Sequence, residues 1–386
     1  MHRPSANWLN AIAMVSARST RACAHGLLSR KMFKTMTDEE LPLPVTLNIV
    51  SESPHTSIII TGLLLLAEQK KILLSVSNDR LNRKYPHPHL VEILVSGRVI
   101  SFDLLDGYNW PIGAVERYLA RIDSYFKRSF SATENETISA RNRSKINPLG
   151  FNYHVTYPGN PIEPKAGFRE TLKSIFRKMV LGNGASNFFP DVFQKNAEKC
   201  RGIPRVMFVT RLWDPASGPA ADREEREEIN QMRIGIITEL RKTLGPAFIG
   251  GLDDDSYSRR ISRKLVLGRS VTSRRNYIEL MKSRDICIGS MGLHRSIGWK
   301  TGEYVAAARA IVDQRFYYEV PGGFEEGGNY LPYATIAECV ACVESLVDSP
   351  DRVSEMKLAN QLYYEKYGRP DRMVWNAILK ALGNGL

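Results

Sequence analysis

The sequence predicts an α/β protein built from two units, each containing a sheet of buried strands covered by helices. Short apolar segments alternate with segments of helical periodicity in both halves of the chain, which is typical of parallel sheets. The 386 residues exceed the size of one ordinary domain and suit two. A hydrophobic content of 43% and a charged content of 24% indicate a globular protein.

The N-terminal residues 1–42 are expected to be an extension outside the fold. The first 37 residues carry several Arg and Lys side chains and no acid before Asp38, as an import peptide would. A true start at Met32 or Met36 explains the same composition.

The first unit, residues 43–155, is interpreted as the acceptor-side domain. Its apolar segments predict strands at 45–50, 71–76, 90–95 and 99–104. Helices are predicted at 54–69 and 111–126, where apolar residues recur with helical spacing. The turn signal Asn147-Pro148-Leu149-Gly150 lies near its end.

Residues 156–203 are rich in proline and predict a linker with one amphipathic helix at 167–180. The second unit covers 204–366, and residues 367–386 form a last helix expected to cross back to the first unit. The strands of the second unit are predicted at 205–210, 247–251, 285–289 and 310–313. Its helices are predicted at 223–244, 274–282, 298–308, 336–347 and 351–366, with the last helix of the chain at 373–382.

The formal net charge is +12, and the basic residues are scattered rather than gathered in a run. A basic surface without function, a phosphate-bearing substrate and an anionic membrane surface all remain compatible with this charge. An odd number of widely spaced cysteines indicates a reducing compartment. The Cys339–Cys342 pair lies in a predicted helix without a second pair, so neither a metal nor a redox centre is expected. No apolar stretch is long enough to span a bilayer, and we expect a cytoplasmic protein that is able to lie at the inner face of the membrane.

The loop after the first strand lacks the glycines of a dinucleotide-binding turn, so no nicotinamide or flavin cofactor is expected. It contains His55 instead, at a position where parallel α/β sheets bind ligands. His55 is the candidate general base for an acceptor hydroxyl, and local packing at a helix start is the alternative. Asp103 and Asp106 end a strand and are candidate polar site residues, whereas Asp253–Asp255 is interpreted as a solvated loop.

Residues 289–303 form the densest group of candidate binding residues, GSMGLHRSIGWKTGE. A strand leads through a glycine-containing loop, including Gly292, into a helix whose first N–H groups favour an anion. His294, Arg295 and Lys300 flank this start and supply the positive charge that a diphosphate requires. The alternative is a turn whose basic side chains point to water.

The segment 302–312, GEYVAAARAIV, resembles the donor-site helix and following strand of GT-B glycosyltransferases, where "LEAMAxGxPVV" is found. The segment 208–212, FVTRL, is similar to the "GRL" of their donor domain, and 147–151, NPLGF, to their "PNG" turn. YFKRSF at 125–130 and NYLPY at 329–333 resemble parts of bacterial polysaccharide glycosyltransferases of group 1, or family four. The resemblance implies two Rossmann-like domains facing across a cleft, a diphosphate bound by Arg211 and a ribose held by Glu303.

The chain departs from that family at two points. The lysine expected shortly after Arg211 is missing, which leaves Lys300 as its replacement, and the first glutamate of the E-x7-E pair is Arg295. The resemblance still implies a metal-independent transferase that moves a sugar from a nucleotide-diphosphate sugar to a glycan or lipid-linked acceptor in polysaccharide biosynthesis. A non-catalytic scaffold of the same shape and a basic nucleic-acid-binding protein are the alternatives, although no nucleic-acid-binding module is visible.

Overall fold

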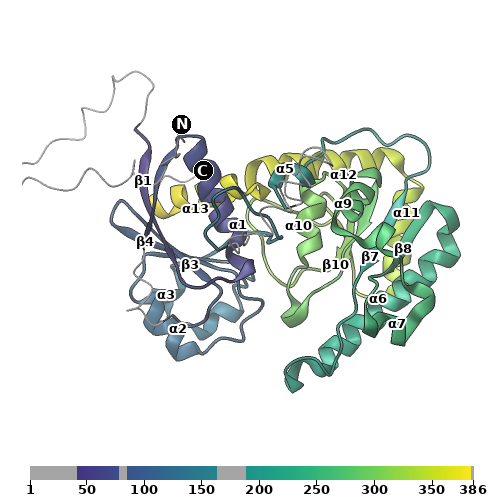
Figure 1. Cartoon of the computed structure of the whole chain (residues 1–386), viewed down its shortest axis with the longest axis horizontal. Helices are drawn as coiled ribbons and strands as arrows, with labels where there is room; N and C mark the ends of the chain where they lie inside the picture. Colours follow the sequence, from purple (N-terminus) through teal and green to yellow (C-terminus); the bar gives the residue numbers. More distant parts are fainter. Residues whose placement is uncertain (1–40, 78–84, 163–187, 384–386) are drawn as a thin grey trace, which may run out of the picture. The chain divides into compact units, whose positions relative to one another are not determined.

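The structure is a computed structural model that describes residues 41–77, 85–162 and 188–383 (Figure 1). The predicted N-terminal extension, apart from its last two residues, and the predicted helix at 167–180 lie outside the described residues.

The first lobe contains a six-stranded sheet in the order β2-β1-β3-β4-β5-β6. The strands are β1 (Leu43–Ile49), β2 (Ile72–Ser77), β3 (Leu90–Val95), β4 (Arg98–Asp103), β5 (Ser124–Lys127) and β6 (Ile146–Pro148). The helices are α1 (Ser57–Glu68), which follows a 3-10 turn at Pro54–Thr56, α2 (Ile112–Leu119) and α3 (Ala140–Arg143).

The sheet of the first lobe is mixed, which corrects the expectation of a parallel one. Strand β3 runs antiparallel to both β1 and β4. The cause is the tight turn between β3 and β4, where Ser96 and Gly97 have φ of 49° and 77°. Two successive positive φ values are typical of hairpin turns, which return the chain beside itself.

The predicted helix at 111–126 is too long, because α2 ends at Leu119 and Ser124–Lys127 form strand β5. Asp123 accepts a hydrogen bond from the backbone N–H of Val99 at 2.7 Å, which aligns the segment with β4. Tyr125 is fully buried in the resulting parallel pair. Pairing with β4 therefore overrides the local helical periodicity.

The second lobe contains five parallel strands in the order β11-β10-β9-β7-β8. They are β7 (Val206–Thr210), β8 (Phe248–Leu252), β9 (Ile286–Ile288), β10 (Ala310–Gln314) and β11 (Leu331–Tyr333). Its helices are α6 (Arg223–Leu244), α7 (Ser256–Ser262), α8 (Arg269–Thr272), α9 (Arg274–Ser283), α10 (Trp299–Ala306), α11 (Ile336–Val347) and α12 (Pro350–Tyr363). Every residue of β7 and β9 is buried, as expected for parallel strands covered on both faces.

Two segments connect the lobes. The first contains the short helix α5 (Pro190–Phe193). In the second, α12 continues through a π-helical turn, η7 (Tyr364–Gly368), into α13 (Pro370–Leu382). Helix α13 packs against α1 of the first lobe, where Gly62 leaves room for the backbone of Pro370.

The α/β class with two Rossmann-like lobes, the architecture called GT-B, is confirmed by these two sheets and their helices. Among the described residues, no helix combines the length and the apolar character needed to cross a bilayer.

Candidate functional site

The strand order of the second lobe marks the place where a ligand is expected. The chain leaves β7 through α6 to reach β8 on one side, and later enters β9 on the other side of β7. The loops that follow β7 and β9 therefore diverge, which opens a crevice at the carboxyl ends of these strands. Ligands of open parallel sheets bind at such a switch point.

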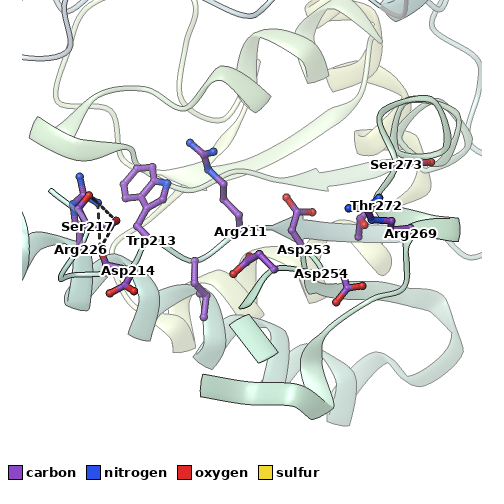
Figure 2. Close-up of a pocket in the computed structure, with 12 residues that line it drawn as sticks. Arg211, Trp213, Asp214, Ser217, Arg226, Asp253, Asp254, Arg269, Thr272 and Ser273 are labelled. Carbon is purple, nitrogen blue, oxygen red and sulfur yellow. Dashed lines mark hydrogen bonds between the residues drawn. The ribbon is translucent and has the colours of Figure 1, made fainter. Parts of the chain in front are cut away.

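A pocket of about 570 Å³ opens at the carboxyl ends of β7 and β8 (Figure 2). It is lined by Arg211, Leu212, Trp213, Asp214, Ser217, Arg226, Asp253, Asp254, Asp255, Arg269, Thr272 and Ser273. Of the residues predicted from the sequence to bind or react, Arg211 alone is in this lining.

Arg211 is exposed, and its side chain extends from the end of β7 between Trp213 and Asp253 (Figure 2). Its guanidinium lies 5.9 Å from the centre of the Trp213 ring and forms no ion pair with a described residue. Burial raises the pKa of Asp253, while Lys300 and Arg211 oppose this shift. The pocket thus presents Arg211 and Asp253 to a ligand, and Arg226 and Arg269 add further positive charge to its lining.

The three acids interpreted as a solvated loop have separate roles. Asp253 faces the pocket, whereas Asp254 pairs with Arg259 at 2.5 Å. Asp255 caps α7, since its carboxylate accepts hydrogen bonds from the Ser258 N–H at 2.8 Å and hydroxyl at 2.7 Å. They do not converge on one point, and no group of three or more metal-ligating side chains occurs among the described residues.

The loop between β9 and α10 carries three of the predicted donor-site residues. The N–H of Gly292 donates to the Ser296 carbonyl at 2.7 Å, which closes the loop. His294 and Arg295 both have positive φ, 56° and 57°. A left-handed conformation costs about 1–2 kcal/mol per non-glycine residue, so the loop is strained and is held by its contacts.

Those contacts hold the backbone of His294 and direct the Arg295 side chain toward neighbours, and neither residue lines the pocket. The Tyr318 hydroxyl donates to the His294 carbonyl at 2.7 Å. The Arg295 guanidinium lies 3.7 Å from the centre of the Tyr317 ring and 3.2 Å from the Glu134 carboxylate of the first lobe.

Lys300 and Glu303 lie on α10, whose first turn begins at the end of this loop. The Lys300 ammonium donates to the Val209 carbonyl of β7 and lies 4.6 Å from the centre of the Tyr277 ring. Burial lowers its pKa to about 8, so it remains largely protonated at neutral pH. Glu303 is buried, and one of its oxygens pairs with Arg274 of α9 at 2.8 Å, while Oε2 has no hydrogen-bond partner among the described residues.

His55 lies in the 3-10 turn that follows β1. Its ring centre is 4.9 Å from that of His89 and 4.9 Å from that of Trp299, the first residue of α10. The structure therefore brings His55 to the helix that carries Lys300 and Glu303. Burial lowers the pKa of His55 to about 4, and its Nδ1 has no hydrogen-bond partner among the described residues.

A buried ion pair lies at the ends of β4 and β5. The sequence indicated its aspartate, Asp103, but not its lysine, Lys127. Lys127 lies 2.8 Å from Asp103, and neither side chain is exposed. Burial opposes ionisation of Asp103, yet the Lys127 ammonium and His87 hold its pKa well below its usual range. A charged residue inside an apolar strand, as in SYFK, is the signal that could have identified Lys127.

Next to this pair, Arg128 joins the two lobes. Its guanidinium pairs with Asp106 and donates to the Ile297 carbonyl at 2.7 Å. Ile297 belongs to the loop that leads into α10, so the first lobe contacts the strained loop through Arg128 as well as Glu134.

No family model matches this sequence, and no curated protein matches it. Solved structures with a similar arrangement include the pneumococcal O-GlcNAc transferase GtfA in complex with UDP and GlcNAc, with 12% identity and a TM-score of 0.37 over 83% of this chain and 54% of that one. A UDP-GlcNAc 2-epimerase from Neisseria meningitidis bound to UDP-GlcNAc shows 13% identity and a TM-score of 0.36 over 71% and 64%.

The C-terminal domain of a group 1 glycosyl transferase family protein, LpcC, from Francisella tularensis shows 11% identity and a TM-score of 0.33. That match spans 46% of this chain and 97% of that domain. Similarity at this level concerns the general α/β architecture and carries no information about activity.

Proposed function

We propose that the chain is a glycosyltransferase that moves a sugar from a nucleoside-diphosphate sugar to a hydroxyl of a glycan or lipid-linked acceptor. The observation that carries this proposal is the pocket beside the switch point of the second lobe, with Arg211 and Asp253 both available to a ligand. A diphosphate needs fixed positive charge, and a nucleoside offers hydroxyl groups to a carboxylate.

In the proposed reaction, the bond between the sugar carbon and the diphosphate oxygen breaks, and the acceptor oxygen bonds to that carbon. Arg211 and the N–H groups of the first turn of α10 stabilise the departing diphosphate. Lys300 adds positive charge below the end of β7. The acceptor proton passes to a base, and His55 stays the candidate, with its neutral imidazole beside α10.

The ribose has two candidate acceptors. Glu303 offers Oε2, because its other oxygen is already in an ion pair with Arg274. Asp253 offers a carboxylate in the pocket itself. We expect the nucleotide to be held by Arg211, Lys300 and one of these two carboxylates.

A scaffold without turnover is the second candidate, and the contacts of Arg295 favour it. Arg295 occupies the position of a glutamate in the glycosyltransferase family that the sequence resembles. Its guanidinium forms an ion pair with Glu134 and a cation–π contact with Tyr317. A protein that binds a nucleotide sugar and never releases the diphosphate, in the presence of any acceptor, would be such a scaffold.

The proposal is tested first by thermal unfolding with UDP, ADP, GDP and dTDP. A ligand at one hundred times its Kd stabilises the folded chain by about 2.7 kcal/mol. Arg211→Ala should abolish this shift without changing the Tm of the free protein, since Arg211 is exposed. Arg275→Ala, an exposed arginine of α9 outside the pocket lining, is the matched control and should keep the shift.

Turnover is then followed as release of the nucleoside diphosphate from its sugar conjugate with glycan and lipid-linked acceptors. Arg211→Ala should reduce this rate by about a hundred- to a thousandfold, as removal of a donor to a developing anion does. Full activity in the folded variant, or conversion of the nucleotide sugar to an isomer without diphosphate release, would contradict the proposal.

A further inference from the structure

Arg233 of α6 is buried, with 5% of its surface exposed, and its side chain reaches the crevice between β7 and β9. Its Nη1 donates to the carbonyl of Arg211, at the end of β7, at 2.8 Å. Its Nε donates to the Ser290 hydroxyl at 3.0 Å and its Nη2 to the Met291 carbonyl at 3.2 Å, both after β9. One guanidinium thus ties together the two loops that diverge at the switch point.

The charge of Arg233 is not neutralised by a partner. All three hydrogen-bond acceptors are uncharged groups, and no carboxylate of the described residues lies within ion-pair distance. The guanidinium also lies 4.6 Å from the centre of the Trp213 ring. Burial lowers the pKa of Arg233 to about 10, which leaves it protonated at neutral pH.

A buried cation without a counter-ion is unfavourable unless something in its surroundings compensates it. The carboxyl group that influences it electrostatically is Asp313, whose pKa burial raises to about 7. The Asp313 carboxylate accepts a hydrogen bond from the Thr301 hydroxyl at 2.6 Å. A guanidinium has five N–H groups, and the three hydrogen bonds to described residues leave two of them unused. An anion in the crevice would supply the missing compensation.

We propose that Arg233 is a positioning residue for the diphosphate of a bound nucleotide: it fixes the loops after β7 and β9 relative to each other and places positive charge beneath them. This inference rests on the proposed function, because it assigns Arg233 to the same site.

Arg241 provides a matched control on the same helix. It is partly buried, and its guanidinium donates to the carbonyls of Gly250 at 2.6 Å and Lys264 at 3.0 Å. It therefore also ties backbone carbonyls together, but these belong to β8 and the segment after α7, outside the pocket lining. A purely structural role for Arg233 would make both arginines behave alike.

The experiment uses the full chain and calorimetric titration with the nucleoside diphosphate that stabilises it most, beginning with UDP, and with the matching monophosphate and nucleoside. Arg233→Met should weaken diphosphate binding by about 10- to 100-fold, the range of a lost hydrogen bond to a charged group. Binding of the nucleoside, which lacks phosphate, should stay unchanged. Arg241→Met should lower the Tm and leave all three affinities unchanged.

Two further variants keep the inference testable if Arg233→Met folds poorly. Arg233→Lys retains the charge but cannot bridge three acceptors, so its diphosphate affinity should lie between those of the wild type and Arg233→Met. Diphosphate binding by Arg233→Ala should recover with millimolar guanidinium, an amount far below denaturing concentrations.

Unchanged diphosphate affinity in a folded Arg233 variant would overturn the inference and leave the proposed function in place. An equal loss for the nucleoside and the diphosphate would also overturn it, because the effect would then be general to the pocket. Failure of the wild-type chain to bind any nucleoside diphosphate would overturn both.

Discussion

The imidazole of His55 is kept neutral by its surroundings rather than by a partner. Burial has the largest effect on its pKa; Asp106 opposes this effect, and Arg128, His89 and His154 add to it. The result is a neutral base that lies beside the first residue of α10 and accepts a proton only weakly. A base of this kind needs the acceptor or a developing charge nearby to raise its pKa during the reaction.

The pKa of His55 leads to a prediction for stability. Its value is about 4 in the folded chain and 6.5 in the unfolded chain, so the unfolded chain takes up this proton first as the pH falls. The stability contributed by the neutral imidazole is therefore fully present above pH 6.5 and is lost as the pH falls toward 4. We predict a steeper decrease of Tm over this range for the wild type than for His55→Gln, measured by thermal unfolding.

The comparison of the two proteins isolates His55, because His89 also has a lowered pKa and contributes to both curves. Parallel curves would show that the imidazole is solvated in the folded chain, and would remove burial as the reason for its neutrality.

At the scale of elements, the ion pair between Arg274 and Glu303 joins α9 to α10. Glu303 is 3% exposed, and the Arg274 guanidinium lies 4.9 Å from the centre of the Phe193 ring. This pair holds α10 against the helix that precedes β9, and so orients the helix start that the proposed function assigns to the diphosphate.

Breaking this pair should lower stability, because removing Glu303 leaves the partly buried Arg274 guanidinium without its counter-ion. We predict that Glu303→Ala lowers the free energy of unfolding by about 3 kcal/mol, a typical loss for a buried pair. The measurement is urea denaturation, with Glu279→Ala, an exposed glutamate of α9, as control. The control should change the free energy by less than about 0.5 kcal/mol; a similarly small change for Glu303→Ala would show that the pair adds nothing.

At the scale of the whole molecule, the last helix of the chain belongs to the core of the first lobe. Val374 and Ile378 of α13 are fully buried in the same cluster as Ile59 and Leu63 of α1. The Gln69 amide also donates to the Asp371 carboxylate at 3.0 Å. Folding of the first lobe therefore depends on residues more than 300 positions away, and the two lobes should unfold together.

Gly62 tests this packing. A Cβ at this position would overlap the carbonyl of Pro370 and the side chain of Val374. Gly62→Ala should force α13 away from α1 and lower the free energy of unfolding by about 1–3 kcal/mol, as overpacking of a core does. Gly113→Ala in α2 is the control, because its Cβ would meet only the Arg117 side chain at 3.5 Å.

We expect Gly113→Ala to be neutral or slightly stabilising, since alanine favours a helix over glycine by up to about 1 kcal/mol. Scanning calorimetry measures both variants. Equal Tm values for Gly62→Ala and the wild type would mean that α13 does not require close contact with α1.

The sequence by itself determined the α/β class and most elements, because hydrophobic periodicity is a local property of the chain. Strand β3, helix α6 and helix α11 have the predicted bounds. Arg211 was identified by the resemblance of the segment FVTRL to a family motif, and the structure places it in the pocket lining directly after β7.

Only the tertiary structure decided the properties that depend on distant partners. The direction of β3 and the conversion of 124–127 into β5 follow from pairing with neighbouring strands. The partners of Glu303 and Arg233 come from α9 and from two separate loops, which no local pattern brings together. Whether a charged residue faces a ligand or a neighbouring chain segment depends on burial and on distant partners, and those are set only when the chain is packed.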